Sequence, residues 1–326
     1  EYEFAVRAGK QLLVAMREAT SGRDFDAIIA SEYESIGGRD LRIVYVAVCI
    51  ATAGGYTVSA QQIVALTDGE PNLVLAALKG DFQDIIVPAG EGRGAYHARH
   101  RIIASLIVDG IAPREIVKEA YIRLLQVLSR DLPRNPRRSD RVFRLYKNVI
   151  NHATVWDRFQ RKLEMARDVF ESIREYFRSD HHYWLQYGSL ELEYGELDLA
   201  ETYIDAAASI DPDDEIVQTT RALLFYKRSE VTDRISEASA FREAAREILI
   251  EQIKHRVDAV YPYHIMCSGE LQYIRTWLSG YEVRKRPLEE LKRDIDSAVK
   301  KHPYSDRLAD LKKQIDGAYL ELALDQ

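Results

Sequence analysis

Apolar residues recur at helical spacing along most of the chain, and this pattern predicts a mainly helical protein. The segment from Asp40 to Ala53 is apolar at nearly every position, which is typical of a helix in the middle of a core. Residues 4–36 predict two earlier helices, separated by a break at residues 20–22. Pro113 opens another helix, whose apolar stripe contains Ile116, Val117, Ala120, Tyr121, Leu124, Leu125 and Leu128.

Short elements are predicted between residue 54 and Pro113. Ser59 suits the N-cap of a helix that runs to Leu66, and Pro71 suits the first turn of a helix that ends near residue 80. Residues 84–88 and 94–98 are β-prone, with a glycine-rich turn between them, and residues 101–109 are apolar again. Three helices followed by a hairpin is the order of elements in a winged helix, which this stretch resembles.

An internal repeat of about 34 residues is the best-defined architectural signal in the chain. Its second copy resembles a tetratricopeptide repeat (TPR), although Glu191 stands where that family prefers tyrosine. The residues that carry the resemblance are Trp184, Gly188, Gly195, Leu197, Ala200, Ile204, Ala207 and Pro212. We expect Gly188 and Ala207 to let two helices approach closely, and Trp184 to fill the gap between them.

Beyond residue 228 the register of the repeat is lost, but the pattern remains helical. It predicts one long helix over 240–260, a break at Tyr261-Pro262-Tyr263, further helices over 271–278 and 288–298, and a last helix over 308–323. The expected fold class is therefore mainly α, with a winged-helix domain and its small β-hairpin followed by a TPR-like α-solenoid.

Composition limits the classes of protein to which the chain belongs. With 326 residues, 46% hydrophobic and 30% charged, it has enough apolar material for a large core. The two cysteines, Cys49 and Cys267, exclude a disulfide framework and favour a reducing, cytoplasmic setting. The longest apolar run is too short to cross a bilayer. Because the chain begins with Glu1 rather than methionine, we expect it to be a piece of a longer protein.

Catalytic motifs are missing from the sequence. It contains no GxxxxGK[ST] phosphate loop, no GxSxG and no HExxH, so the chain itself is not expected to be an enzyme. Asp180-His181-His182 could supply two metal ligands, but a helix start explains it better. His264 and Cys267 lack a third ligand nearby, so no metal site is predicted.

The sharpest local cluster is His97, Arg99, His100 and Arg101, directly before the apolar run IIASLIV. Histidine and arginine at the start of a helix attract phosphate. The cluster resembles the end of the winged helix in STAND-type signalling ATPases, whose apolar-histidine-acid motif touches the diphosphate of the resting nucleotide. His100 matches that histidine, whereas Arg101 replaces the acid. Residues 9–33 resemble the end of the lid subdomain in the same family. The alternative is a salt-bridged contact without a ligand.

Residues 130–147 carry seven basic and two acidic side chains, a local charge of +5 in a protein of net charge −7. We consider Arg134, Arg137, Arg138, Arg141 and Arg144 a candidate patch for an anion or nucleic acid. A solvated loop is the favoured interpretation, because few aromatic residues are interleaved. DNA recognition by the third helix of the winged helix is also disfavoured, because that helix has Lys79 and no arginine.

The resemblances divide the chain into four parts: a helical lid remnant (1–38), a winged helix (39–112), a helical linker with a basic loop (113–155) and a TPR-like sensor domain (156–326). They imply the regulatory part of a bacterial STAND ATPase of the antiviral-defence kind. The repeats would bind a protein trigger, and the winged helix would relay this to the nucleotide state and to oligomerisation.

No cofactor is expected in this chain, and ADP or ATP would belong to an upstream ATPase domain of the parent protein. The expected partners are the trigger, that ATPase domain and, after activation, further copies of the protein; no membrane is expected, and nucleic acid is disfavoured. The alternatives are a winged-helix transcription regulator with repeats and a non-catalytic scaffold.

Overall fold

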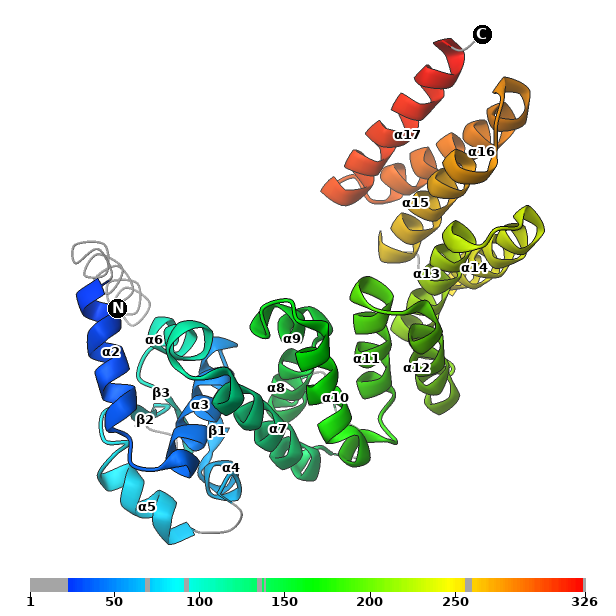
Figure 1. Cartoon of the computed structure of the whole chain (residues 1–326). Helices are drawn as coiled ribbons and strands as arrows, with labels where there is room; N and C mark the ends of the chain where they lie inside the picture. Colours follow the sequence, from blue (N-terminus) through cyan, green and yellow to red (C-terminus); the bar gives the residue numbers. More distant parts are fainter. Residues whose placement is uncertain are drawn as a thin grey trace. The chain divides into compact units, whose positions relative to one another are not determined.

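A computed structural model of the chain describes residues 23–67, 71–90, 94–133, 137, 139–255 and 260–324. It is mainly helical, as the hydrophobic pattern predicts, and it has one small three-stranded sheet (Figure 1). The helix predicted over residues 4–16, and the candidate residues Arg134 and Arg138, lie outside the described residues. Two compact units follow one another along the chain, Glu1–Arg178 and Ser179–Gln326. Of the helices described here, none combines the length and apolarity needed to cross a membrane.

The first unit contains helices of very different lengths around the small sheet. Its elements are α2 (Arg23–Ser35), α3 (Arg39–Ala53), β1 (Val58–Ser59), α4 (Ala60–Ala65), α5 (Pro71–Lys79), β2 (Ile86–Pro88), β3 (Ala95–Ala98), α6 (Arg101–Leu106), the π-helical turn η1 (Ile107–Ile111), α7 (Arg114–Asp131), α8 (Arg141–Val149), α9 (His152–Arg158) and α10 (Leu163–Phe177).

Helix α3 forms the centre of this unit, because nearly every residue from Leu41 to Ala53 is buried. A helix that is apolar on all sides can only be stable when other elements surround it. Here α7, α6 and β3 pack against it. The hydroxyl of Thr52 accepts a hydrogen bond of 2.9 Å from the backbone N–H of Ala98, which ties the end of α3 to β3.

The sheet has the strand order β1-β3-β2, and both pairs are antiparallel. Val58 pairs with Tyr96, and Val87 pairs with His97. The hairpin of β2 and β3 falls in the two predicted β-prone runs, but β1 was not predicted because two residues are too few to show an alternating pattern. Ser59 caps α4 as expected, in a reciprocal arrangement with Gln62.

Two features of the first unit were not predicted. The apolar run 101–109 is divided between two elements, because α6 ends at Leu106 and the chain continues as η1 to Ile111. Helix α9 was not predicted at all. It has seven residues, and only Val155 is buried among them, so it shows no apolar stripe.

The second unit contains only helices. These are α11 (His181–Tyr194), α12 (Leu197–Ile210), α13 (Glu215–Val231), α14 (Ile235–His255), α15 (Val260–Trp277), α16 (Tyr281–Lys301) and α17 (Asp306–Leu324). Neighbours in sequence pack as antiparallel pairs, most extensively α11 with α12, α13 with α14 and α16 with α17 (Figure 1).

The break predicted at Tyr261-Pro262-Tyr263 is wrong, because these residues form the first turn of α15. Proline is tolerated there, since the N–H that it lacks has no helical partner in a first turn. Helix α14 also ends earlier than predicted, at His255. Pro287 lies within α16, in its second turn, so that helix begins well before the predicted residue 288.

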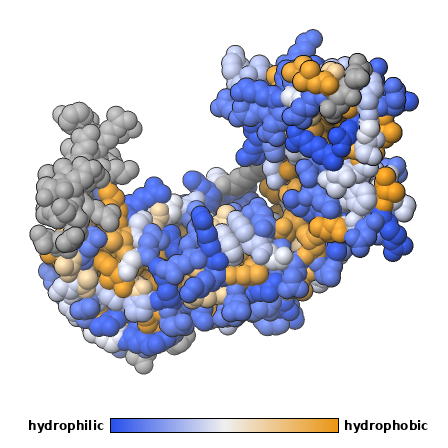
Figure 2. Space-filling model, turned by 45° about the horizontal axis from the view of Figure 1, so that its top comes forward, coloured by the Kyte–Doolittle hydropathy of each residue, from blue (hydrophilic) through white to orange (hydrophobic). Residues whose placement is uncertain are grey.

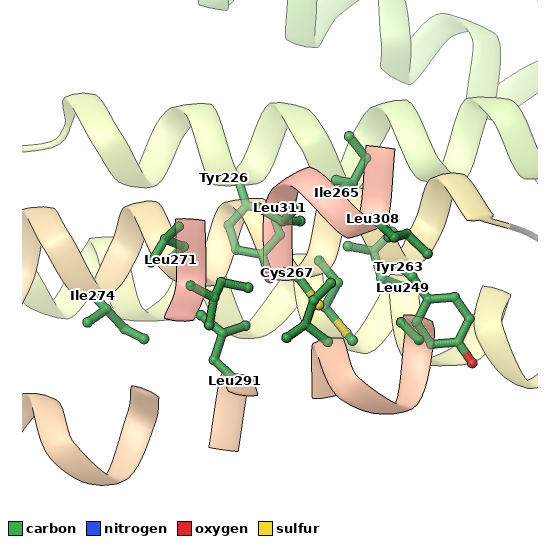
Figure 3. Close-up of a cluster of buried hydrophobic side chains, with 14 of the residues drawn as sticks. Tyr226, Leu249, Tyr263, Ile265, Cys267, Leu271, Ile274, Leu291, Leu308 and Leu311 are labelled. Atoms are coloured by element: carbon green, nitrogen blue, oxygen red, sulfur yellow. The ribbon is translucent and has the colours of Figure 1, made fainter. Parts of the chain in front are cut away.

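Five helices, α13 to α17, contribute buried side chains to the core of the second unit (Figure 3). The ring of Tyr226 packs on Gly269, where a Cβ atom would come within 2.4 Å of the ring carbons. Apolar side chains that include Leu271, Leu291 and Leu311 surround this contact. Cys267 is a buried free thiol in the same cluster, and burial raises its pKa to about 12.

Candidate functional site

The predicted phosphate corner lies at the end of β3 and the start of α6 in the first unit, where each side chain has a partner. His100 is the N-cap of α6, and its Nδ1 accepts a hydrogen bond of 3.1 Å from the N–H of Ile102. This bond assigns the ring proton of the neutral histidine to Nε2. His97 is half-buried, and its Nδ1 lies 2.7 Å from the carbonyl oxygen of Ala98.

The two arginines of the corner point to different partners. Arg99 donates from Nη2 to both carboxylate oxygens of Glu32 on α2, at 2.9 and 2.6 Å. Arg101 donates from Nε to the carbonyl oxygen of Ala53, at 2.8 Å. That oxygen lies at the C-terminal end of α3, where a positive charge is favourable. The carboxylate of Glu32 therefore occupies the N–H donors of Arg99 that a phosphate oxygen would use.

The basic run forms part of α8 in the first unit. Asp140 caps this helix and accepts from the N–H of Val142 at 3.0 Å. Arg141 and Arg144 are exposed on α8, and Arg137 is exposed just before it. The guanidinium of Arg144 lies over the ring of Tyr56, 5.9 Å from its centre.

Tyr56 follows the glycine pair that ends α3, and this turn brings the two basic clusters together. A Cβ atom at Gly54 would lie 2.4 Å from Oδ1 of Asn148 on α8. A Cβ atom at Gly55 would lie 4.0 Å from Nη1 of Arg101. Arg101 and Arg144 therefore flank the same turn, although the sequence analysis assigned them to separate sites.

The residues of the predicted repeat all lie on or beside α11 and α12 in the second unit. Gly188 lies where the two helices approach closely, because a Cβ atom there would lie 2.6 Å from Cγ1 of Ile204. Ala200 and Ala207 are fully buried, and Trp184 packs against the cluster of Leu185, Ala207 and Val217. Gly195 ends α11, and Pro212 is exposed after α12.

Glu191 is fully buried, and its Oε2 accepts a hydrogen bond of 3.1 Å from the N–H of Glu196. The carboxylate thereby binds the backbone of the turn between α11 and α12. This contact accounts for a polar residue at a position where the repeat pattern favours tyrosine.

A groove of about 410 Å³ lies between α13, α15 and α17 of the second unit. Leu223, Ile265, Leu271 and Leu311 give it apolar walls, and the Tyr226 ring on Gly269 adds a rigid wall. Polar side chains complete the lining. They are Lys227, Glu230, Ser268, Gln272, Arg275 and Gln314. Lys227 pairs with Glu230 at 3.3 Å, whereas no ion pair of Arg275 is found among the described residues.

A partly buried ionic cluster joins α14 to two of the helices that line this groove, α13 and α15. Glu270 on α15 is 4% exposed and accepts hydrogen bonds from Arg242 on α14, the shortest at 2.6 Å. Arg246 lies 3.1 Å from the same carboxylate, and the hydroxyl of Tyr226 donates to it at 2.9 Å. Burial and the neighbouring Glu270 raise the pKa of Tyr226, so its hydroxyl stays protonated.

One group of side chains has the composition of a metal site. His181, Asp211 and Asp214 offer ligand atoms that lie within 4.8 Å of one another. The ring nitrogens of His181 face the two carboxylates at 4.0 and 3.7 Å. Asp214 already caps α13 by accepting from the N–H groups of Ile216 and Val217. A histidine paired with two acids at a helix start explains the group without a metal.

Tyr56 and the groove residues could not be predicted as site residues from the sequence. Tyr56 stands alone after two glycines, and the groove combines side chains from three helices whose register the repeat pattern had lost. Comparison of the chain with protein-family models, curated proteins and solved structures finds no match. The candidate sites are therefore inferred from the geometry of the structure.

Proposed function

We propose that this chain is the regulatory and sensor part of a STAND-type signalling ATPase, in which the second unit binds a protein trigger. The groove between α13, α15 and α17 carries the proposal, because it combines apolar walls with hydrogen-bonding side chains. Aliphatic walls suit the apolar side chains of a peptide segment. Gln272 and Gln314 can bond its backbone, and Arg275 suits a carboxylate.

The pairing of the helices supports a TPR-like interpretation of the second unit. Alternate helices also pack on one another, α13 on both α11 and α15, and α17 on α15. In a stack of this kind, alternate helices line one face, on which solenoids bind their partners. The groove lies on three such helices.

The order of elements supports a winged-helix interpretation of the first unit. Helices α3, α4 and α5 precede the hairpin of β2 and β3, and β1 adds a third strand beside β3. Helix α5 exposes two large apolar side chains, Leu73 and Leu75, which are 37% and 53% exposed. Exposed leucines favour packing against protein over contact with DNA.

The side chains of α5 also weaken the alternative of a transcription regulator. The single basic side chain of α5 is Lys79. Exposed apolar residues elsewhere are scattered among hydrophilic ones on the face shown in Figure 2, which is ordinary for a protein surface.

Nucleotide retention tests the proposal in the complete gene product. We expect purified protein to carry ADP, which denaturation and chromatography would detect, and we expect His100→Ala to release it and raise basal activity. Glu32→Gln is the informative partner variant, because it frees Arg99 for a phosphate and is expected to strengthen retention. A complete gene product without nucleotide, or with retention unchanged by His100→Ala, would remove the nucleotide part of the proposal.

The groove is tested separately, by its effect on stimulation. Gln272→Trp fills the groove from an exposed position, whereas Lys254→Trp on α14 places the same bulk outside it. We expect a trigger that stimulates nucleotide exchange in the wild type to lose its effect on Gln272→Trp and keep it on Lys254→Trp. Equal stimulation of both variants would exclude the groove.

A further inference from the structure

A second surface of the first unit has chemistry that the protein-trigger proposal does not use. We call it the α8 surface, and it consists of Arg101, Arg141, Arg144 and Lys147 around Tyr56. Arg101 and Arg144 flank the turn that ends α3. Arg141 and Lys147 lie one turn of α8 before and after Arg144, a spacing at which helical side chains are neighbours.

The α8 surface gathers four cations that have no ion pair among the described residues, whereas several other arginines of the unit are paired. Arg39, Arg99, Arg123 and Arg158 each lie within ion-pair distance of a carboxylate. No described carboxylate pairs with any of the four cations of the α8 surface. The nearest acid in sequence, Asp140, is occupied as the N-cap of α8. Cations clustered without counter-charges repel one another, and an external polyanion relieves that repulsion.

Aromatic rings accompany the cations. Arg144 lies over Tyr56 at 5.9 Å, and Lys147 lies over Phe143 at 5.3 Å. Both rings are half-buried, so each is held in place by its surroundings. A guanidinium that rests on a ring keeps its in-plane N–H groups for a phosphate, and its outer face can receive a base.

We propose that the α8 surface binds a single strand of nucleic acid through its phosphate backbone, without sequence preference. The three arginines are exposed, so an extended polyanion can reach them from solvent. Arginine suits phosphate because its donors form two parallel bonds, and stacking of bases on Arg144 favours a single strand over a duplex. Basic and acidic residues number 26 and 23 in the first unit, so the unit is net positive, and this adds attraction at long range.

The test is fluorescence anisotropy of a labelled 20-nucleotide oligothymidylate with the full chain over a series of salt concentrations. The variant Arg101→Gln/Arg141→Gln/Arg144→Gln removes three charges from the surface. Arg39→Gln/Arg161→Gln/Arg178→Gln removes three charges from exposed positions elsewhere in the unit, and circular dichroism checks that both variants fold. The variant Lys79→Gln tests whether the basic side chain of α5 contributes to nucleic-acid binding.

We expect the wild type to bind more weakly as salt rises. The surface variant should lose at least tenfold in affinity, and its slope of log affinity against log salt should fall by about 2, since each phosphate contact on a single strand contributes about 0.7. The control triple variant and Lys79→Gln should change affinity less than threefold. Tyr56→Leu should weaken single-strand binding by about tenfold, the size of one lost stacking contact, and leave duplex binding unchanged.

Several results would overturn the proposal. These are no binding at low salt, equal losses in the surface and control variants, a loss confined to Lys79→Gln, or tighter binding of duplex than of single strand. Polyglutamate of matched charge that displaces the oligonucleotide equally well would reassign the surface to an acidic protein. None of these results bears on the groove of the second unit.

Discussion

Small residues decide how closely helices approach in this protein, and two glycines illustrate opposite cases. Gly188 lies where α11 meets α12, and an added Cβ atom would lie 2.6 Å from Ile204. Gly317 lies within α17, and an added Cβ atom would meet nothing within 4 Å. The same substitution should therefore have opposite effects at these positions.

We expect Gly188→Ala to lower the free energy of unfolding by about 1–3 kcal/mol, because Ile204 must move. Gly317→Ala should raise it by about 0.5–1 kcal/mol, because alanine is the better helix former and meets open space. Urea unfolding monitored by circular dichroism measures both. Adding Ile204→Ala to Gly188→Ala should cost less than Ile204→Ala alone, and strict additivity would contradict the steric explanation.

Glu270 is the residue on which the ionic cluster of the second unit depends. Its carboxylate faces Arg242, Arg246 and the hydroxyl of Tyr226 at once. Removing it leaves two half-buried guanidinium groups without this counter-charge, so Glu270→Ala should cost about 2–3 kcal/mol. Tyr226→Phe removes one hydrogen bond and should cost about 1 kcal/mol. Similar losses from both, measured by urea unfolding, would mean that packing rather than charge dominates.

Most elements could be predicted from the sequence because their burial is periodic. Helix α3 was found because it is apolar all round, and Pro113 marked the start of α7 correctly. The errors have local causes. Pro262 was interpreted as a break, although a first turn accommodates proline, and α9 buries too few residues to show a stripe.

The candidate sites were less predictable than the elements. His100 was singled out correctly as the start of a helix, but its hydrogen bond to Ile102 and the pairing of Arg99 with Glu32 depend on tertiary contacts. The meeting of Arg101 with Arg144 depends on how α8 packs against the end of α3. No periodicity in the sequence reports that packing.

Helices α3 and α7 are joined by a charged clamp that should titrate in acid. Glu119 on α7 is bonded by Arg39 at 2.5 Å and by Arg123 at 2.6 Å, and Arg123 also pairs with Asp40 at 3.0 Å. Burial alone would raise the pKa of Glu119, but the hydrogen bonds from the two arginines outweigh it and lower the pKa below its ordinary 4.5.

A carboxyl group whose pKa is lower in the folded state stabilises that state above the ordinary pKa, and the contribution disappears as the pH falls through the folded pKa. Glu119→Gln should therefore destabilise the chain at pH 7, and the difference from the wild type should shrink below about pH 4.5. Thermal unfolding across pH 3–7 measures this. A difference that stays constant with pH would show that the carboxylate charge is not responsible, and Glu115→Gln, at a largely exposed neighbour, serves as the control.

At the scale of the whole molecule, the two units differ in net charge, and the boundary between them also separates their apolar cores. The first unit has 26 basic and 23 acidic residues, a net charge of +3, and the second has 19 basic and 29 acidic residues, a net charge of −10. The second unit also has its own apolar cluster, to which α13 to α17 contribute. Each unit therefore has what an independent fold requires.

Residues 179–326 expressed alone should consequently fold into α11 to α17 and unfold in one cooperative transition. Their helical circular dichroism and midpoint should match one transition of the full chain, and Glu270→Ala should shift that transition equally in both. Gly188→Ala should also lower the midpoint of this transition. Glu119→Gln should leave unchanged the transition of the full chain that corresponds to residues 179–326. A fragment that unfolds gradually, or a Glu119→Gln variant that shifts both transitions together, would show that the two units depend on each other for their stability.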